Sequence, residues 1–362
     1  MKKLEGQVGD GKCQWLHIGS KDCNSTYIIN ESCTTRCIVY KYLGDHVSDG
    51  WEPLYRKRHE RSQGYAVKCQ AMCTEISLGY QLYQVAKLLH TALFLNGTLV
   101  NMETWPHFTE KRIILFERAE QGLFRRILCA HSKTPVETLY LELGIIPFRF
   151  HLMMRRIVYF HEILHRSDGE LTKKIVVSQL VKMTKGDFAE QALNDMALLN
   201  LTKNECLEMS NNKLKDVLKE KACSAAFKHL INKAKIHSKV NAEVYSNVDG
   251  MAYINNPQFS PDLVNILFKF RTRMFNVKNN FRNNYRQTNT LCPLCNLCED
   301  TQNHMFECAM ILDQLDKPLT TTYKDIFSPD TTILLKVAKE LKTIVTVRED
   351  LENQLNESIE AL

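Results

Sequence analysis

Four side chains near residue 300 have the types and spacing of a metal site: Cys292, Cys295, His304 and Cys308. The Cys-Pro-Leu-Cys segment allows a tight turn to aim two thiolates at one ion. His304 and Cys308 stand four positions apart, which would place them on one face of a helix. Three sulfurs and one imidazole are a common ligand set for a closed, tetrahedral structural zinc site. Such a site leaves no open position for chemistry, so we expect the zinc to fold a small loop whose surface meets nucleic acid or another protein.

Cys298 leaves the ligand set ambiguous, because it could replace Cys295 or stay outside the site. Met305 and Phe306 are placed to pack beneath the ion. The competing interpretation is that these are ordinary reduced cysteines in a helical protein, with His304 on its surface. Four candidate ligands in so short a stretch favour the metal site.

The segment before this motif mixes basic and aromatic residues. Ser260 and Pro261 predict the start of a helix, with serine as the cap and proline at the first helical position. The basic residues are Arg271, Arg273, Lys278, Arg282 and Arg286, and the aromatic ones include Phe275, Phe281 and Tyr285. Cations contact phosphates and aromatic rings stack on unpaired bases, so these residues predict contact with RNA or DNA. The alternative is a core helix whose arginines are solvated.

A second basic stretch lies in the helix expected from residue 52 onward. Arg56, Lys57 and Arg61 are the residues there that we expect to contact nucleic acid. Lysines also surround the helix expected from Lys213 to about His237, where a solvated face and a binding face fit the pattern equally well.

The elements that would carry these side chains are mainly α-helical. Residues 13–18 and 36–43 predict short strands, because they are rich in β-branched and aromatic residues and each precedes a glycine. Further helices are expected at residues 80–95, 109–129, 135–144, 147–164, 170–182, 187–199, 261–274, 333–345 and 348–362. His161 and His165, four positions apart on one of them, are expected to be surface histidines.

The chain has 362 residues, of which 44% are hydrophobic and 24% charged, values ordinary for a folded protein of two or three modest domains. Its net charge of +6 permits an anionic partner without requiring one. Thirteen mostly scattered cysteines without an export signal indicate a reducing compartment, the nucleus or the cytoplasm. No apolar run reaches the roughly 20 residues of a membrane span, so no membrane partner is expected.

Several stretches together resemble the C-terminal part of a non-LTR retrotransposon reverse transcriptase polyprotein. Residues 12–19 and 40–45 are similar to the closing strands of the polymerase palm, and Tyr42, Leu43 and Gly44 resemble the primer-grip hairpin of that family. Residues 96–99, 103–105, 139–147 and 271–274 are similar to its helical thumb and connector. The Cys-Pro-Leu-Cys motif with His304 and Cys308 resembles its CCHC zinc knuckle. The likeness keeps the family order from about residue 10 to 310.

The resemblance implies a mainly α fold with a small N-terminal β remnant of a palm. It divides the chain into palm-terminal strands at 1–50, a thumb-like region at 51–168, a helical connector at 169–258, a basic helix plus CCHC knuckle at 259–312 and a helical tail at 313–362.

The resemblance also points to a missing activity. The family polymerase holds two metal ions with carboxylates from an early strand and from an aromatic-x-Asp-Asp hairpin, and no Asp-Asp pair occurs in this chain. We therefore expect no catalytic residues and no enzyme activity. The function expected is that of a truncated portion that binds RNA or DNA through the thumb, basic helix and knuckle. The palm and fingers portion of the parent polyprotein would be a further partner. The alternatives are a protein-interaction scaffold derived from a mobile element and an inert fragment of an RNA-directed DNA polymerase.

Overall fold

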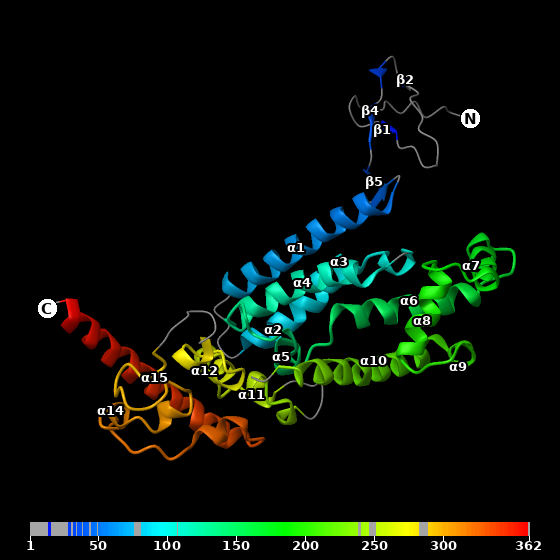
Figure 1. Ribbon diagram of the computed structural model, residues 1–362. Helices are drawn as coiled ribbons and strands as arrows, with labels where there is room; N and C mark the ends of the chain where they lie inside the picture. The colour runs from blue at the N-terminus through cyan, green and yellow to red at the C-terminus, as the bar shows by residue number, and fades with distance from the viewer. Residues whose placement is uncertain are drawn as a thin grey trace.

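The computed structural model describes residues 14–15, 28–29, 32–33, 35–37, 39–42, 45–48, 50–75, 81–106, 108–237, 240–245, 251–281 and 289–360. Helices make up most of these residues, which confirms the predicted mainly α fold class. The helical body is elongated, with the short strands near one end and the long C-terminal helix at the other (Figure 1). Within the described ranges, no helix combines the length and the apolar character that crossing a membrane requires.

The described strands are short and pair two at a time. β1 (Gln14–Trp15) pairs in parallel with β4 (Thr35–Arg36), and β2 (Ile28–Ile29) pairs antiparallel with β3 (Ser32–Cys33). β5 (Val39–Tyr42) and β6 (Asp45–Ser48) form an antiparallel hairpin that leads into the first helix. Tyr42 pairs with Asp45 at the turn of this hairpin, whereas Leu43 and Gly44, the other primer-grip-like residues, lie outside the described residues.

The first group of helices leads from the hairpin to the centre of the molecule. It comprises α1 (Trp51–Glu75), α2 (Leu82–Leu89), the π-helical turn η2 (His90–Leu95), α3 (Asn96–Leu99), the 3-10 turn η3 (Met102–Thr104), α4 (Glu110–Ile127) and α5 (Val136–Leu143). α1 and α4 run in parallel, because Arg112 and Glu52 pair at their starts while Arg126 donates to Gln70 near their ends. Gly97 of α3 leaves room for the ring of Tyr65 of α1, since a Cβ there would lie 2.4 Å from that ring.

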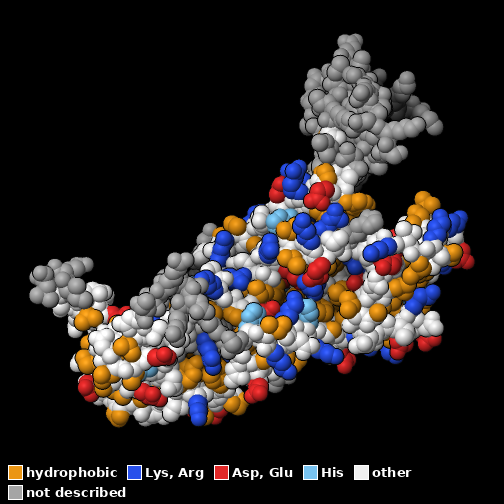
Figure 2. All heavy atoms as spheres, in the orientation of Figure 1, with side chains coloured by type: hydrophobic (Ala, Val, Ile, Leu, Met, Phe, Trp, Pro, Cys, Tyr) orange, Lys and Arg blue, Asp and Glu red, His pale blue; other side chains and the backbone are white. Residues whose placement is uncertain are grey.

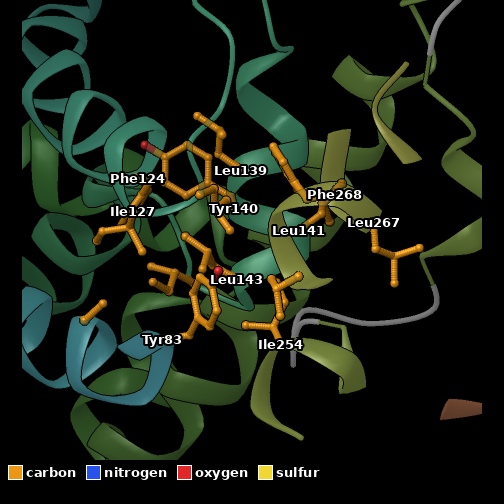
Figure 3. Packing of buried hydrophobic residues seen from close by; sticks show 14 of the residues in the cluster. Tyr83, Phe124, Ile127, Leu139, Tyr140, Leu141, Leu143, Ile254, Leu267 and Phe268 are labelled. Atoms are coloured by element: carbon orange, nitrogen blue, oxygen red, sulfur yellow. The ribbon is translucent and has the colours of Figure 1, made fainter. Parts of the chain in front are cut away.

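Helix α5 lies at the centre of the main hydrophobic core. Figure 3 shows its apolar side chains between those of α2 and α4 on one side and those of two later helices on the other. The packed residues labelled there are Tyr83, Phe124, Ile127, Leu139, Tyr140, Leu141, Leu143, Ile254, Leu267 and Phe268. Segments far apart in the sequence therefore meet around α5.

The second group of helices packs around α6 (Phe148–Leu164). Gly144 ends α5 in the left-handed conformation (φ 66°), and α6 begins directly after Pro147, both as the sequence predicts. The group continues with α7 (Leu171–Lys182), α8 (Phe188–Leu198), α9 (Lys203–Glu208) and α10 (Asn211–Ala234). A second hydrophobic cluster, which includes Phe160, Met196 and Leu214, lies between α6, α8 and α10.

The remaining elements are short until the last helix. They are η4 (Ala242–Val244), α11 (Ala252–Asn255), α12 (Pro261–Arg271), η5 (Lys278–Phe281), η6 (His304–Phe306), α14 (Ala309–Leu312), η7 (Tyr323–Phe327) and α15 (Thr331–Glu360). Ser260 caps α12 as predicted, since its hydroxyl accepts a hydrogen bond from the Leu263 N–H. The two helices predicted in the tail are one continuous helix, α15, which packs against α12. The main core runs from α1 through α5 to α15, and the predicted domain boundaries remain a prediction.

Buried carboxylates join the helices across both cores. Glu120 of α4 accepts hydrogen bonds from the Tyr140 hydroxyl and from the Phe148 N–H at the start of α6, and it contacts His90 Nε2 at 2.7 Å. Arg149 pairs with Glu117, and Arg156 pairs with Asp195. Each of these acids and arginines has at least one charged or hydrogen-bonding partner, as burial of a charge requires.

The Glu142 carboxylate of α5 joins elements from distant parts of the sequence. It is fully buried and accepts hydrogen bonds from the hydroxyls of Tyr245 and Tyr253, both at 2.7 Å, and from Arg271 Nε at 3.0 Å. Arg271 in turn donates to the carbonyl of Ile326 at 2.6 Å. The Glu142 carboxylate thus joins α5 to the residue that follows η4, to α11 and to α12, and Arg271 extends this network to η7.

Replacing Glu142 by glutamine should destabilise the protein by about 3–5 kcal/mol, because the guanidinium of Arg271 would stay buried without its counter-charge. Urea unfolding followed by circular dichroism measures this change. Glu60→Gln is the matched control, since Glu60 is exposed and pairs with Lys57 on the surface of α1. Equal stability of the two variants would contradict the structural role of Glu142.

His151 of α6 is held neutral by its surroundings. Burial lowers the pKa of His151 to about 4, and neighbouring His90 also lowers it. In the unfolded chain the pKa of a histidine is about 6.5. Between these two values the unfolded chain binds more protons than the folded one, so stability present above pH 6.5 is lost as the pH falls towards 4.

Lowering the pH from 7.5 to 5 should therefore remove on the order of 2 kcal/mol of stability through His151 alone. A His151→Gln variant, which cannot take up this proton, should lose less stability than the natural chain over that interval. Denaturant unfolding at both pH values tests this, with His165→Gln, an exposed position on the same segment, as the control. An identical pH dependence in His151→Gln and the natural chain would refute the assignment.

Candidate metal centre

The structure brings the four predicted ligands together. The sulfurs of Cys292 and Cys308 lie 3.9 Å apart, and Cys295 Sγ lies 3.3 Å from His304 Nε2. All four donor atoms lie within 4.8 Å of one another. A tetrahedral zinc ion with ordinary bond lengths separates two sulfurs by ~3.8 Å and a sulfur from a nitrogen by ~3.6 Å. The quartet can therefore hold one metal ion, and its donors are compatible with zinc.

The first half of the centre is a tight turn closed by backbone hydrogen bonds. The Cys292 N–H donates to the Cys298 carbonyl at 2.8 Å, and the Asn296 N–H donates to the Cys292 carbonyl at 2.9 Å. Asn296 has a left-handed conformation (φ 52°), which asparagine tolerates better than most residues. This turn points the first two thiols of the quartet at the same place, as the Cys-Pro-Leu-Cys spacing predicts.

The second half differs from the prediction. His304 and Cys308 do not share a helix, so that expectation is wrong. His304 begins the 3-10 turn η6, whereas Cys308 has an extended conformation and precedes α14. The hydroxyl of Thr301 accepts a hydrogen bond from the His304 N–H and fixes the start of η6. The break after Phe306 turns the Cys308 sulfur towards Cys292.

Cys295, and not Cys298, lies close enough to the other three donors to be a metal ligand. Cys298 is exposed and is not in the quartet. Burial alone would raise the pKa of the Cys295 thiol, but hydrogen bonds from the backbone at Leu297 and Cys298 and from His304 lower it to about 6. Cys295 is therefore a thiolate at neutral pH, which is the form that binds a metal.

The centre is attached to the helical body by apolar packing and by one ion pair. Met305 and Phe306 are buried in the main core, as predicted for residues beneath the ion. Asp300 accepts two hydrogen bonds from Arg348 of α15, at 2.7 and 3.0 Å, and one from the Lys278 N–H at 2.8 Å. Sequence reasoning missed Asp300 and Arg348, because a single acid and a single arginine 48 positions apart carry no local signal.

The structure places the residues predicted to contact nucleic acid in different environments. Arg56, Lys57 and Arg273 are exposed, Arg61 is half-buried and donates to the Tyr65 hydroxyl, and Lys278 donates to the Leu291 carbonyl of the metal loop. Arg282 and Arg286 lie outside the described residues.

The prediction that Arg271 contacts nucleic acid is wrong. Its guanidinium is buried and pairs with Glu142, so it cannot reach a phosphate on the surface. Phe281 is also buried, with its ring against His131, so it is not placed to stack on a base.

The prediction that His161 and His165 are both surface histidines is wrong for His161 alone. His161 is buried rather than on the surface, and its Nε2 lies 3.0 Å from the Met209 carbonyl. His165 is exposed as predicted, and the two rings lie 4.1 Å apart. Among the described residues, only the Cys/His quartet groups three or more metal-binding side chains closely enough for one ion.

Comparison of the chain with protein-family models, with curated proteins and with solved structures finds no match.

The quartet predicts a metal content that depends on Cys295 and not on Cys298. The purified protein should contain about one zinc ion per chain, and Cys295→Ser should lower both this content and the melting temperature, because a structural zinc site normally has four protein ligands. Elemental mass spectrometry and thermal unfolding measure the two effects. Cys298→Ser is the matched control and should keep the metal. Loss of metal from Cys298→Ser, with metal retained in Cys295→Ser, would show that Cys298 and not Cys295 is the ligand.

Proposed function

We propose that this protein binds RNA or DNA, that zinc occupies its Cys/His quartet and that it does not itself catalyse nucleic-acid synthesis. The observation that carries the proposal is the closed quartet. Its buried cysteines belong to the same hydrophobic core as the inner faces of α1 and α4, whose outer faces carry exposed basic residues. The nucleus or the cytoplasm, where its partners and reduced thiols would be found, is the compartment that fits this proposal.

The quartet supports a structural role for the metal. Four protein donors fill a tetrahedral ion, so no position stays open for water or substrate. Zinc bound by Cys292, Cys295, His304 and Cys308 would hold two short loop segments together and so fix the surface they present.

The parallel pair of α1 and α4 supports nucleic-acid binding. Exposed cations lie along both helices, and Figure 2 shows basic side chains spread over the length of α1. They are Arg56, Lys57 and Lys68 on α1 and Lys111, Arg118 and Arg126 on α4. The exposed carboxylates on the described part of these helices are Glu52, Glu60 and Glu110, so the cations outnumber them. A helix of 25 residues spans ~37 Å, enough to contact several successive phosphates.

The resemblance to the C-terminal part of a non-LTR retrotransposon reverse transcriptase supports the same function. In this proposal β5 and β6 correspond to the end of a palm, the following helices to the thumb and connector, and the quartet to the CCHC knuckle. The absence of an adjacent aspartate pair from the sequence supports a non-catalytic role. Primer extension on a primed RNA template by the purified chain would overturn that part of the proposal.

Four exposed apolar side chains on α7 favour a second candidate function, a protein-interaction scaffold. Leu171 and Val181 are 72% and 80% exposed, and Ile175 and Val177 lie beside them on the same helix. Exposed large apolar side chains gathered on one element mark many protein-binding surfaces. Partners that remain bound after nuclease treatment, and that a Val181→Lys variant loses, would favour this function over the first.

Charge reversal on α1 tests the nucleic-acid proposal. Arg56→Glu, Lys57→Glu and Lys68→Glu together should weaken binding of a fluorescent single-stranded RNA and reduce the salt slope, by ~0.7 for each phosphate that the variant no longer neutralises. Fluorescence anisotropy over a series of salt concentrations measures both quantities.

The matched control makes the same change of net charge elsewhere. Lys174, Lys182 and Lys185 are exposed on and just after α7, and their reversal to glutamate should leave RNA binding almost unchanged. Binding that ignores salt, or no binding at low salt, would refute the proposal.

A further inference from the structure

A cleft of about 690 Å³ lies on the body formed by the helices, away from the metal centre. Its walls come from α2 and η2, from the α5–α6 connection, from α6 and from α10. Figure 2 shows histidine, basic and hydrophobic side chains gathered in the middle of the face over these helices. Ligand sites commonly have volumes of about 300–1,000 Å³, so this cleft has the size of a small-molecule site.

One wall of the cleft carries two lysines. Lys215 and Lys219 are exposed one helical turn apart on α10, and neither forms an ion pair within the described part of the chain. Of the two carboxylates in the cleft, Glu103 pairs with Arg155 at 3.6 Å, whereas Glu162 accepts a hydrogen bond from the neutral amide of Asn211 at 3.0 Å and keeps its negative charge. The cleft also contains Lys87, so its cations outnumber its carboxylates. The two lysines therefore favour an anionic ligand.

The floor of the cleft suits a flat body with polar edges. Ile146, Met154 and Val158 supply apolar surface, whereas Tyr159 and Thr91 supply hydroxyl groups. An alkyl chain would leave those hydroxyls and the cleft carboxylates facing apolar atoms, which is unfavourable. A sugar and a heterocyclic base would match both kinds of surface, because they combine an apolar face with hydrogen-bonding edges.

We propose that this cleft binds a nucleotide, with its phosphate at Lys215 and Lys219 and its base against Ile146, Met154 and Val158. The nucleotide is either free or an unpaired residue of a bound strand. This site is separate from the basic face of α1 and α4, so it does not depend on the function proposed above.

Cys223 supplies a direct readout of occupancy. It lies on α10 one turn beyond Lys219 and lines the same cleft. A bound nucleotide would shield it from a thiol reagent such as N-ethylmaleimide. Cys129 is exposed and does not line the cleft, so it reports the unshielded reaction in the same sample.

The experiment measures alkylation of Cys223 and Cys129 in the full chain by peptide mass spectrometry. The probes are uridine 5′-monophosphate, a short oligouridylate, hexyl phosphate and inorganic phosphate. We expect uridine monophosphate or the oligouridylate to slow the alkylation of Cys223 by about threefold or more at concentrations above their dissociation constants, with Cys129 unaffected. Protection by the monophosphate identifies a free nucleotide as the ligand, and protection by the oligouridylate alone identifies a strand.

Two variants of equal net charge complete the test. Lys215→Glu with Lys219→Glu should abolish protection, whereas Lys213→Glu with Lys228→Glu, two exposed positions of α10 outside the cleft, should keep it. No protection by either uridine probe would overturn the proposal, as would equal protection by hexyl phosphate or inorganic phosphate. Because the α1 variants are measured by RNA anisotropy, failure here and failure of the nucleic-acid proposal can be told apart.

Discussion

The structure depends on one buried charge pair, Glu142 with Arg271. These residues are 129 positions apart, yet their side chains meet in the interior with two tyrosine hydroxyls completing the shell of the carboxylate. Removal of two charges from water is unfavourable unless each finds compensating partners. The pair therefore constrains the segments that supply these partners to one relative arrangement, and α5 becomes the centre about which the early and late helices pack.

A second buried ion pair, Asp300 with Arg348, joins the metal centre to the helical body in a similar way. Met305 and Phe306 anchor the loop of this centre in the main core, and the ion pair of Asp300 with Arg348 attaches the loop to α15. A metal ion held by the quartet would fix the two halves of the loop. The surface next to the loop would thereby be held in a definite position relative to α12 and α15.

Positive charge is distributed over surfaces with different local structure. The α1–α4 pair offers a long, open row of cations, whereas Lys215 and Lys219 border a cleft with an apolar floor. An open row of cations can contact the successive phosphates of a strand, because such contacts do not depend on the shape of the ligand. A cleft instead suits a single chemical group that fills it. The proposed strand-binding and nucleotide-binding roles follow from this difference in shape rather than from the number of cations.

The sequence by itself determined the features that depend on near neighbours. Gly144 ends α5, Ser260 caps α12, and the Cys-Pro-Leu-Cys turn places two thiols together, because each of these signals acts over a few residues. The tertiary structure alone decided that Arg271 and His161 are buried, that His304 and Cys308 lie in separate turns and that Cys295 rather than Cys298 joins the quartet. Those outcomes depend on which distant segments pack together, since burial and ion pairing are set by partners that local spacing does not reveal.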